Sequence, residues 1–103
     1  MSDTITVTFY KKTYSHCSSC DAMATVLQRW IDNHPEAKIK VFTLSVEDNM
    51  DQVRTDFPNA QQAPIVVVDR VNDDINERTW VSGNNPDILV DMLNGDQDIW
   101  DEL

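Results

Sequence analysis

The two cysteines of the chain are the residues whose type and spacing point most directly to chemistry. They are Cys17 and Cys20, separated by two serines. A thiol pair at this spacing can belong to a metal site, form a structural disulfide or work as a redox couple. Residues three apart on a helical turn have Cβ atoms roughly 5–6 Å apart, and a modest adjustment brings them to the separation of about 3.8 Å that a disulfide requires. The pair can therefore open and close without rebuilding the fold.

A metal site is the weaker interpretation of the pair. Structural zinc needs four ligands, and the sequence offers only His16 and His34 besides the two cysteines. Because His16 adjoins Cys17 in the chain, the two side chains cannot easily bind one ion. We therefore expect no metal and no bound cofactor, only a redox-active disulfide.

The composition limits the kind of protein and the cellular compartment to which the cysteine pair can belong. The chain has 103 residues, of which 41% are hydrophobic, and this suffices for one domain with one core. No apolar run approaches the roughly 20 residues of a transmembrane helix, and the first ten residues lack the basic and apolar segments of a signal peptide. We therefore expect a cytoplasmic protein without membrane contact. Stable structural disulfides are rare in that compartment, so the pair is expected to be catalytic.

The charge of the chain limits its partners. Eighteen acidic and eight basic side chains give a net charge of −10, whereas nucleic-acid binding needs clustered cations. We expect no nucleic-acid ligand and, in its place, a protein partner, which an acidic surface favours when that partner is basic. The chain is expected to be a monomer with a single domain over 1–103, a core at about 4–93 and an acidic tail at 94–103.

The order of predicted elements indicates an α/β fold. Alternation of apolar and polar residues predicts strands, and a 3.6-residue period predicts helices. The elements are a strand at 4–10, a helix from Ser18 to a stop at Pro35, a strand at 37–44, a helix opened by a capping box at 45–48, a buried strand at 65–69, a polar turn at 70–77, a strand at 78–82 and a helix from Pro86 to Gly95. The first two strands should be parallel, because they form a β-α-β unit. The order β-α-β-α-β-β-α thus predicts a mixed four-stranded sheet flanked by helices on both faces.

The two sulfurs are not expected to be equivalent. Cys17 falls at the start of the first predicted helix, where free N–H groups and the helix dipole favour an anion. It should therefore supply the thiolate that attacks a substrate. Cys20 lies within the turn and should resolve the mixed disulfide that results. His16, Lys11 and Lys12 could add positive charge beside this thiolate.

Three segments in this order resemble a known family. "CSSC" after the first strand, "QAPIVVVD" and "WVSGNNPDIL" are similar to the glutaredoxin branch of the thioredoxin fold. Within that branch they most resemble NrdH-redoxins, the glutaredoxin-like electron donors of class Ib ribonucleotide reductase. The resemblance covers about residues 4–93. It implies a thioredoxin-like fold and a dithiol–disulfide oxidoreductase that passes electrons to a protein disulfide.

The resemblance also implies roles for individual residues. Cys17 matches the nucleophile and Cys20 the resolving cysteine. Pro64 matches a cis-proline that faces the active site, and the backbone of Ala63 beside it would pair with a substrate segment as an added strand does. Ser82 and Gly83 match the small-residue turn beside the site, and the family's lysine before the nucleophile corresponds to Lys11 or Lys12, of which Lys12 is the expected substrate-binding residue. His16 is added as a substrate-binding candidate because it adjoins Cys17 in the chain.

The electron donor and acceptor are implied less sharply. The double glycine of glutathione-binding glutaredoxins is absent, because Asn84 and Asn85 follow Gly83, and an anionic tripeptide would meet few cations. We therefore expect a thioredoxin-reductase-like flavoenzyme, supplied by NADPH, to reduce the protein better than glutathione does. The expected acceptor is ribonucleotide reductase or another disulfide protein, in deoxyribonucleotide synthesis and cell redox homeostasis. The alternatives are a glutathione-dependent glutaredoxin, a binding module with incidental cysteines, or an iron–sulfur scaffold that borrows further thiolates.

Overall fold

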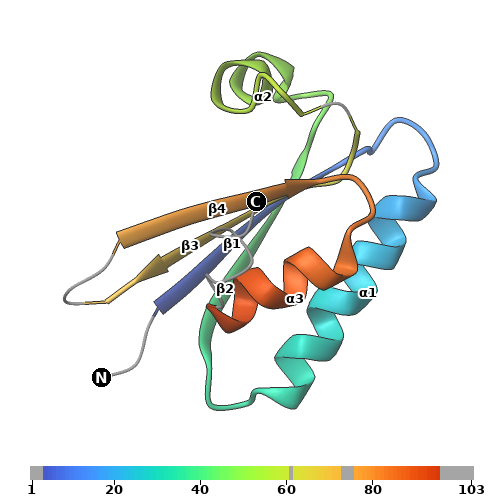
Figure 1. Cartoon of the computed structure of the whole chain (residues 1–103). Coiled ribbons are helices and arrows are strands. Elements are labelled where there is room, and N and C mark those ends of the chain that lie inside the picture. Colours follow the sequence, from blue (N-terminus) through green and yellow to red (C-terminus); the bar gives the residue numbers. More distant parts are fainter. Residues whose placement is uncertain (1–3, 61, 73–75, 96–103) are drawn as a thin grey trace.

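The computed structural model describes residues 4–60, 62–72 and 76–95, and in these it has the predicted order of elements (Figure 1). The strands are β1 (Thr4–Lys11), β2 (Lys38–Ser45), β3 (Ile65–Val71) and β4 (Asn76–Ser82), and the helices are α1 (Ser18–Asn33), α2 (Met50–Asp56) and α3 (Pro86–Asn94). The predicted acidic tail lies outside the described residues from position 96 onward.

The four strands form one mixed sheet in the order β2-β1-β3-β4. As predicted, β1 and β2 are parallel and the β3–β4 hairpin is antiparallel. Tyr10 of β1 pairs with Ile65 of β3, and Ile65 pairs with Ser82 of β4. The end of β1, the start of β3 and the end of β4 therefore meet at one end of the sheet. The three segments on which the family resemblance rests all leave the sheet there.

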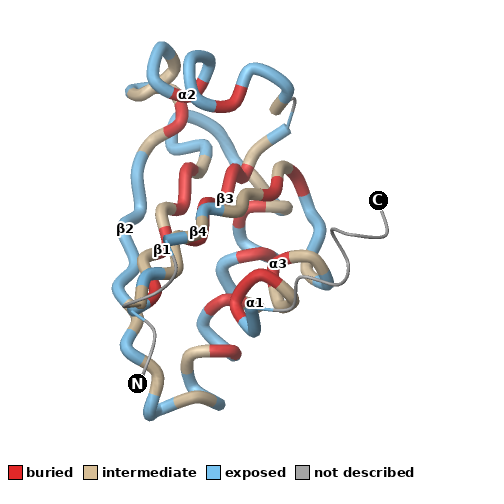
Figure 2. Tube along the Cα trace, turned by 60° about the vertical axis from the view of Figure 1, so that its left-hand side comes forward, coloured by how far each residue is buried: buried red, intermediate tan, exposed pale blue. Residues whose placement is uncertain are grey.

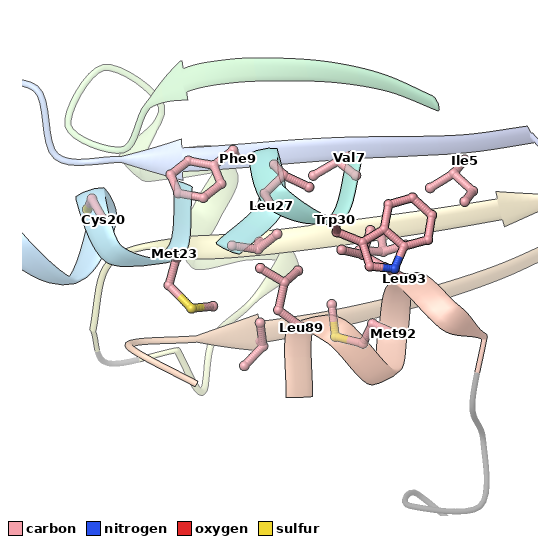
Figure 3. Packing of buried hydrophobic residues seen from close by; sticks show 13 residues of the cluster. Ile5, Val7, Phe9, Cys20, Met23, Leu27, Trp30, Leu89, Met92 and Leu93 are labelled. Carbon is pink, nitrogen blue, oxygen red and sulfur yellow. The ribbon is translucent and has the colours of Figure 1, made fainter. Parts of the chain in front are cut away.

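The main core lies between the sheet and the helices α1 and α3 (Figure 3). The alternation in β1 places Ile5, Val7 and Phe9 on this face, and each is at most 4% exposed. The apolar stripes of the two helices cover them with Met23, Leu27, Trp30, Leu89, Met92 and Leu93. The two predicted amphipathic helices thus pack side by side on one face of the sheet.

Among the described residues, the opposite face of the sheet is covered only at one end. A smaller cluster there joins Val53 and Phe57, from α2 and its C-terminus, to Tyr10, Ile65 and Val67. Farther along the sheet Phe42 is 53% exposed, although it lies in the row of paired residues that continues to Val67. Figure 2 shows β2 largely exposed. The prediction of helices on both faces is confirmed only in this partial form, because α2 has seven residues and is too short to span the sheet.

Two predicted boundaries were wrong. The segment at 70–77 was predicted as a polar turn, yet β3 continues to Val71 and β4 begins at Asn76. Opposite charges face each other where the strands continue. Arg70 and Glu77 are register partners within this segment, and next to it Arg78 donates from Nε to Asp69 Oδ1, its own register partner, at 2.7 Å. The second helix also begins later than its predicted capping box at 45–48, at Met50.

The predicted capping box forms a turn instead of a helix start. Ser45 Oγ accepts the Asp48 backbone N–H at 3.2 Å, which is half of a capping box. In a complete capping box the Asp48 carboxylate would also accept a hydrogen bond from the Ser45 backbone N–H. Here it accepts a hydrogen bond from the Tyr14 hydroxyl instead. This turn is therefore tied to the loop that precedes the cysteines.

The last helix is fixed at both ends as the sequence predicts. Pro86 is at its first turn, and Gly95 ends it in the left-handed conformation with φ of 74°. The Arg70 guanidinium donates to the carbonyl oxygens of Met92 and Leu93, so it satisfies acceptors that the helix end leaves open. Together with the Trp30 Nε1 bond to Asn94 Oδ1 at 2.9 Å, this contact holds α3 against β3 and α1.

Candidate active site

The two cysteines are joined by a disulfide at the start of α1, with Cα atoms 5.2 Å apart. Cys17 is the N-cap residue, with extended backbone (φ −139°), and its sulfur accepts the Cys20 backbone N–H at 3.1 Å. Cys20 is 1% exposed and belongs to the main core (Figure 3). Cys17 is only partly buried and lies at the edge of this core. The predicted inequivalence of the two sulfurs is therefore present in the geometry.

This geometry suits one sulfur to attack and the other to resolve. When the disulfide is open, the Cys20 N–H and the aligned peptide dipoles of α1 face the Cys17 sulfur and favour its thiolate form. Cys20 is held one turn away and shielded from solvent, where it can attack only a partner bonded to Cys17. The arrangement thus suits Cys17 to be the attacking sulfur of the pair and Cys20 the resolving one.

A surface pocket of about 310 Å³ opens over the cysteine pair. It is lined by both cysteines and by residues from the preceding loop and the first turn of α1: Lys11, Lys12, Thr13, Ser15, His16 and Asp21. The structure therefore brings Lys12 and His16 together with the cysteines, as the sequence predicted. Three basic side chains line this pocket although the whole chain carries a net charge of −10.

The proline segment lies at the same end of the sheet and has the conformation that the resemblance implied. The Ala63–Pro64 peptide bond is cis, and Pro64 is fully buried. Ala63 lines a neighbouring pocket of about 380 Å³, and Lys12 lines that pocket as well as the one over the cysteines. Lys12 is thus shared by the two pockets, whereas Pro64 lines neither.

Ser82 and Gly83 hold the proline segment and do not line the cysteine pocket. The Gly83 N–H donates to the Pro64 carbonyl oxygen at 2.9 Å, and the Ser82 hydroxyl donates to the Gln62 carbonyl oxygen at 2.8 Å. Gly83 has φ of 81°, and a Cβ there would lie 2.8 Å from Gln62 Oε1. The Gln62 side chain can move aside from such a Cβ, so it is the positive φ that favours glycine at this position.

Two acidic residues that the sequence prediction missed hold the loop before Cys17. The Glu47 carboxylate accepts the backbone N–H groups of Thr13 at 2.9 Å and Tyr14 at 3.1 Å. The Asp48 carboxylate accepts the Tyr14 hydroxyl, and the hydroxyls of Thr13 and Ser45 lie 2.7 Å apart. We call these contacts of Glu47 and Asp48 with residues 13–14 the loop clamp. No local signal could have revealed it, because its partners are more than 30 positions apart in the chain.

The loop clamp changes the acid–base properties of its members. The hydrogen bonds from the backbone of Thr13 and then of Tyr14 lower the pKa of Glu47 from 4.5 to about 2. The hydrogen bond to the Asp48 carboxylate, and then its charge, raise the pKa of the Tyr14 phenol. The two shifts keep the Glu47 carboxylate ionised and the Tyr14 phenol neutral across the neutral pH range.

Neither a metal-binding cluster nor a membrane-spanning helix is found in the described part of the chain. Within residues 4–60, 62–72 and 76–95, no group of three His, Cys, Asp or Glu side chains is placed to hold a metal ion. In those same ranges, no helix is both long and apolar enough to span a bilayer.

Comparison with known proteins places the fold but not a family. No protein-family model and no curated protein matches the sequence. Among solved structures, mitochondrial thioredoxin 3 of Saccharomyces cerevisiae has 20% sequence identity and a TM-score of 0.63 over 88% of this chain and 77% of its own. The germline-specific thioredoxin Deadhead of Drosophila melanogaster has 14% identity and a TM-score of 0.62 over 89% and 80%. Fasciola hepatica thioredoxin has 16% identity and a TM-score of 0.61 over 88% and 79%.

At these identities the likeness establishes the fold alone. The chain has the thioredoxin fold, which confirms the fold that the sequence resemblance implied. The three structures named are thioredoxins. They do not test the narrower resemblance to glutaredoxins and NrdH-redoxins.

The exposure of the two sulfurs predicts their relative reactivity. In the reduced protein near neutral pH, brief treatment with iodoacetamide should alkylate Cys17 at least about tenfold faster than Cys20. Cys17 is the N-cap of α1 and is partly exposed, whereas Cys20 is buried. No Lys or Arg separates the two residues, so fragmentation of a single tryptic peptide would locate the label. Equal labelling, or a preference for Cys20, would contradict the assignment of the nucleophile.

The loop clamp predicts an acid transition in the loop. Because the folded-state pKa of Glu47 lies below its ordinary value of 4.5, the clamp stabilises the fold fully above that value, and this contribution is lost as the pH falls toward about 2. An NMR titration of the Thr13 and Tyr14 amide shifts should show a midpoint near 2, and Glu47→Gln should abolish it. A midpoint near 4.5, or an unchanged titration in the variant, would show that the clamp does not form.

Proposed function

We propose that this protein is a dithiol–disulfide oxidoreductase that passes electrons through Cys17 and Cys20 to a protein disulfide. The observation that carries the proposal is the asymmetry of the pair: both cysteines line the surface pocket, but the Cys17 sulfur is the helix cap and is only partly buried, while Cys20 is 1% exposed. A structural disulfide has no need of such an arrangement. The thioredoxin fold of the chain is consistent with it.

The reaction takes place in two exchanges, and its electrons balance. The Cys17 thiolate attacks one sulfur of the substrate disulfide, which forms a mixed disulfide and releases the other substrate sulfur as a thiolate. The Cys20 thiol then passes its proton to the substrate thiolate released in the first exchange and attacks the Cys17 sulfur, which releases the second substrate sulfur as a thiolate and forms the Cys17–Cys20 disulfide. The substrate gains two electrons and the cysteine pair loses two, so the oxidised pair must be reduced again by a donor.

The neighbouring residues are proposed to bind the substrate. Lys12 and His16 line the pocket over the cysteines, and their side chains would contact the segment that carries the attacked sulfur. The backbone of Ala63 would pair with that segment in the manner of an added strand. Ser82 and Gly83 would act through this backbone, since they hold the segment with Pro64 in place.

The donor and acceptor follow from the resemblance to NrdH-redoxins. We propose ribonucleotide reductase or another disulfide protein as acceptor, and a thioredoxin-reductase-like flavoenzyme supplied by NADPH as donor. The absence of a second glycine after Gly83 disfavours glutathione. The net charge of −10 opposes an anion at long range, although the basic side chains that line the cysteine pocket would attract its carboxylates at close range. In this proposal the protein is a cytoplasmic monomer with a single domain over 1–103.

A coupled assay tests the proposed function and its donor together. The oxidised protein should be reduced several-fold more efficiently by a thioredoxin reductase with NADPH than by glutathione with glutathione reductase and NADPH. NADPH consumption with a protein disulfide as final acceptor is the readout, and Cys17→Ser, which cannot attack, is the inactive control.

The other outcomes of this assay separate the alternatives. Efficient reduction by glutathione together with failure of the thioredoxin reductase would favour the glutathione-dependent glutaredoxin. If the protein, once reduced with dithiothreitol, transferred electrons to a disulfide no faster than Cys17→Ser does, the oxidoreductase proposal would fail and a binding module would take its place.

A further inference from the structure

Tyr14 is the most exposed of the large hydrophobic side chains in the described part of the chain, at 71%, and it precedes Cys17 by three residues. Consecutive Cα atoms are 3.8 Å apart, so its Cα lies at most roughly 11 Å from that of Cys17. It does not line the pocket over the cysteines, although Thr13 and Ser15 on either side of it do. Its ring therefore lies beside the site and outside it.

An exposed side chain is ordinarily free to change rotamer, but Tyr14 is held at both ends. The Glu47 carboxylate accepts its backbone N–H at 3.1 Å, and the Asp48 carboxylate accepts its hydroxyl. Both acceptors lie in the turn between β2 and α2, and that turn is anchored by the Ser45 hydroxyl, which accepts the Asp48 N–H. The loop clamp thus fixes the orientation of a ring that buries little of its own surface.

A fixed and exposed aromatic ring has the properties of an interface anchor. Tyrosine is enriched among the residues that carry most of the binding energy in protein interfaces. Ordering a free side chain on binding costs affinity, and a side chain that is already ordered avoids this cost. Phe42, on the edge strand β2, is also largely exposed at 53%, but it lies outside the loop clamp and away from the end of the sheet that carries the cysteines.

We propose that Tyr14, held by the loop clamp, is a recognition residue that selects protein disulfides over small disulfides. A small disulfide at Cys17 brings no protein surface that could enclose the ring. A protein disulfide brings a surface with it, and an apolar recess on that surface would receive the ring while Cys17 attacks. The occupant is therefore an oxidised protein substrate with apolar surface beside its disulfide, and the inference rests on the proposed function.

The test compares two oxidants of the pre-reduced protein. Insulin serves as the protein disulfide, and 5,5′-dithiobis(2-nitrobenzoic acid) serves as the small one. Tyr14→Ala should lower the second-order rate constant with insulin about fivefold and leave the rate constant with the small disulfide within about twofold. Tyr14→Phe and Glu47→Gln keep the ring but loosen it, so each should lower the insulin rate constant by less than Tyr14→Ala does. Phe42→Ala removes a similarly exposed ring elsewhere and should change neither rate constant.

The ratio of the two rate constants separates recognition from mere structural damage. A general loss of structure around Cys17 would lower both rate constants together, and that result would overturn the inference. An unchanged ratio in Tyr14→Ala, or the same fall in Phe42→Ala, would overturn it as well while leaving the proposed function intact. If the unmodified protein reacted with neither oxidant faster than Cys17→Ser does, the proposed function would fail and the inference with it.

Discussion

The hydrogen bond from the Cys20 N–H to the Cys17 sulfur is the interaction on which the rest of the site depends. It exists only because Cys17 is the N-cap of α1, so that its sulfur takes the place of the hydroxyl or carboxylate that usually satisfies the first turn of a helix. The same turn places Cys20 in the core with the side chains of α1 and α3. One local contact therefore sets which sulfur is reachable, which is shielded and where negative charge is favoured.

The pairing of the strands places this contact beside the proline segment and the turn at Gly83. Because β1 and β2 are parallel, α1 must begin at the end of β1 and cross back over the sheet. The antiparallel pairing of β3 with β1 and β4 brings the proline segment and the turn at Gly83 to that same end. The opposite end carries contacts with no part in the site, among them Arg70 on the last carbonyls of α3. The cysteine pair thus lies at one end of the sheet, and the contacts that anchor the end of α3 lie at the other.

Local patterns in the sequence predicted the fold and the cysteine pair because both are encoded locally. Alternation in β1, the apolar run of β3 and the stripes of α1 and α3 each reflect one face of one element. The predictions failed where a residue is used by a distant segment. Asp48 had the spacing of a capping box, yet its carboxylate binds Tyr14. Asp69 and Arg78 were predicted as the last and first residues of their strands, yet the hairpin continues beyond this pair to Val71 and Asn76. Such contacts depend on which elements meet, and neither propensity nor period contains that information.

The reduction potential of the Cys17–Cys20 pair tests the central claim most directly. Equilibration with dithiol buffers of known potential, followed by alkylation of free thiols, would give the midpoint of a two-electron transition. A working redox couple of this fold should titrate between about −200 and −270 mV, the range spanned by glutaredoxins and thioredoxin. A midpoint below about −300 mV is typical of structural disulfides, and it would contradict the account by showing that the pair is a fixed bond and not an electron carrier.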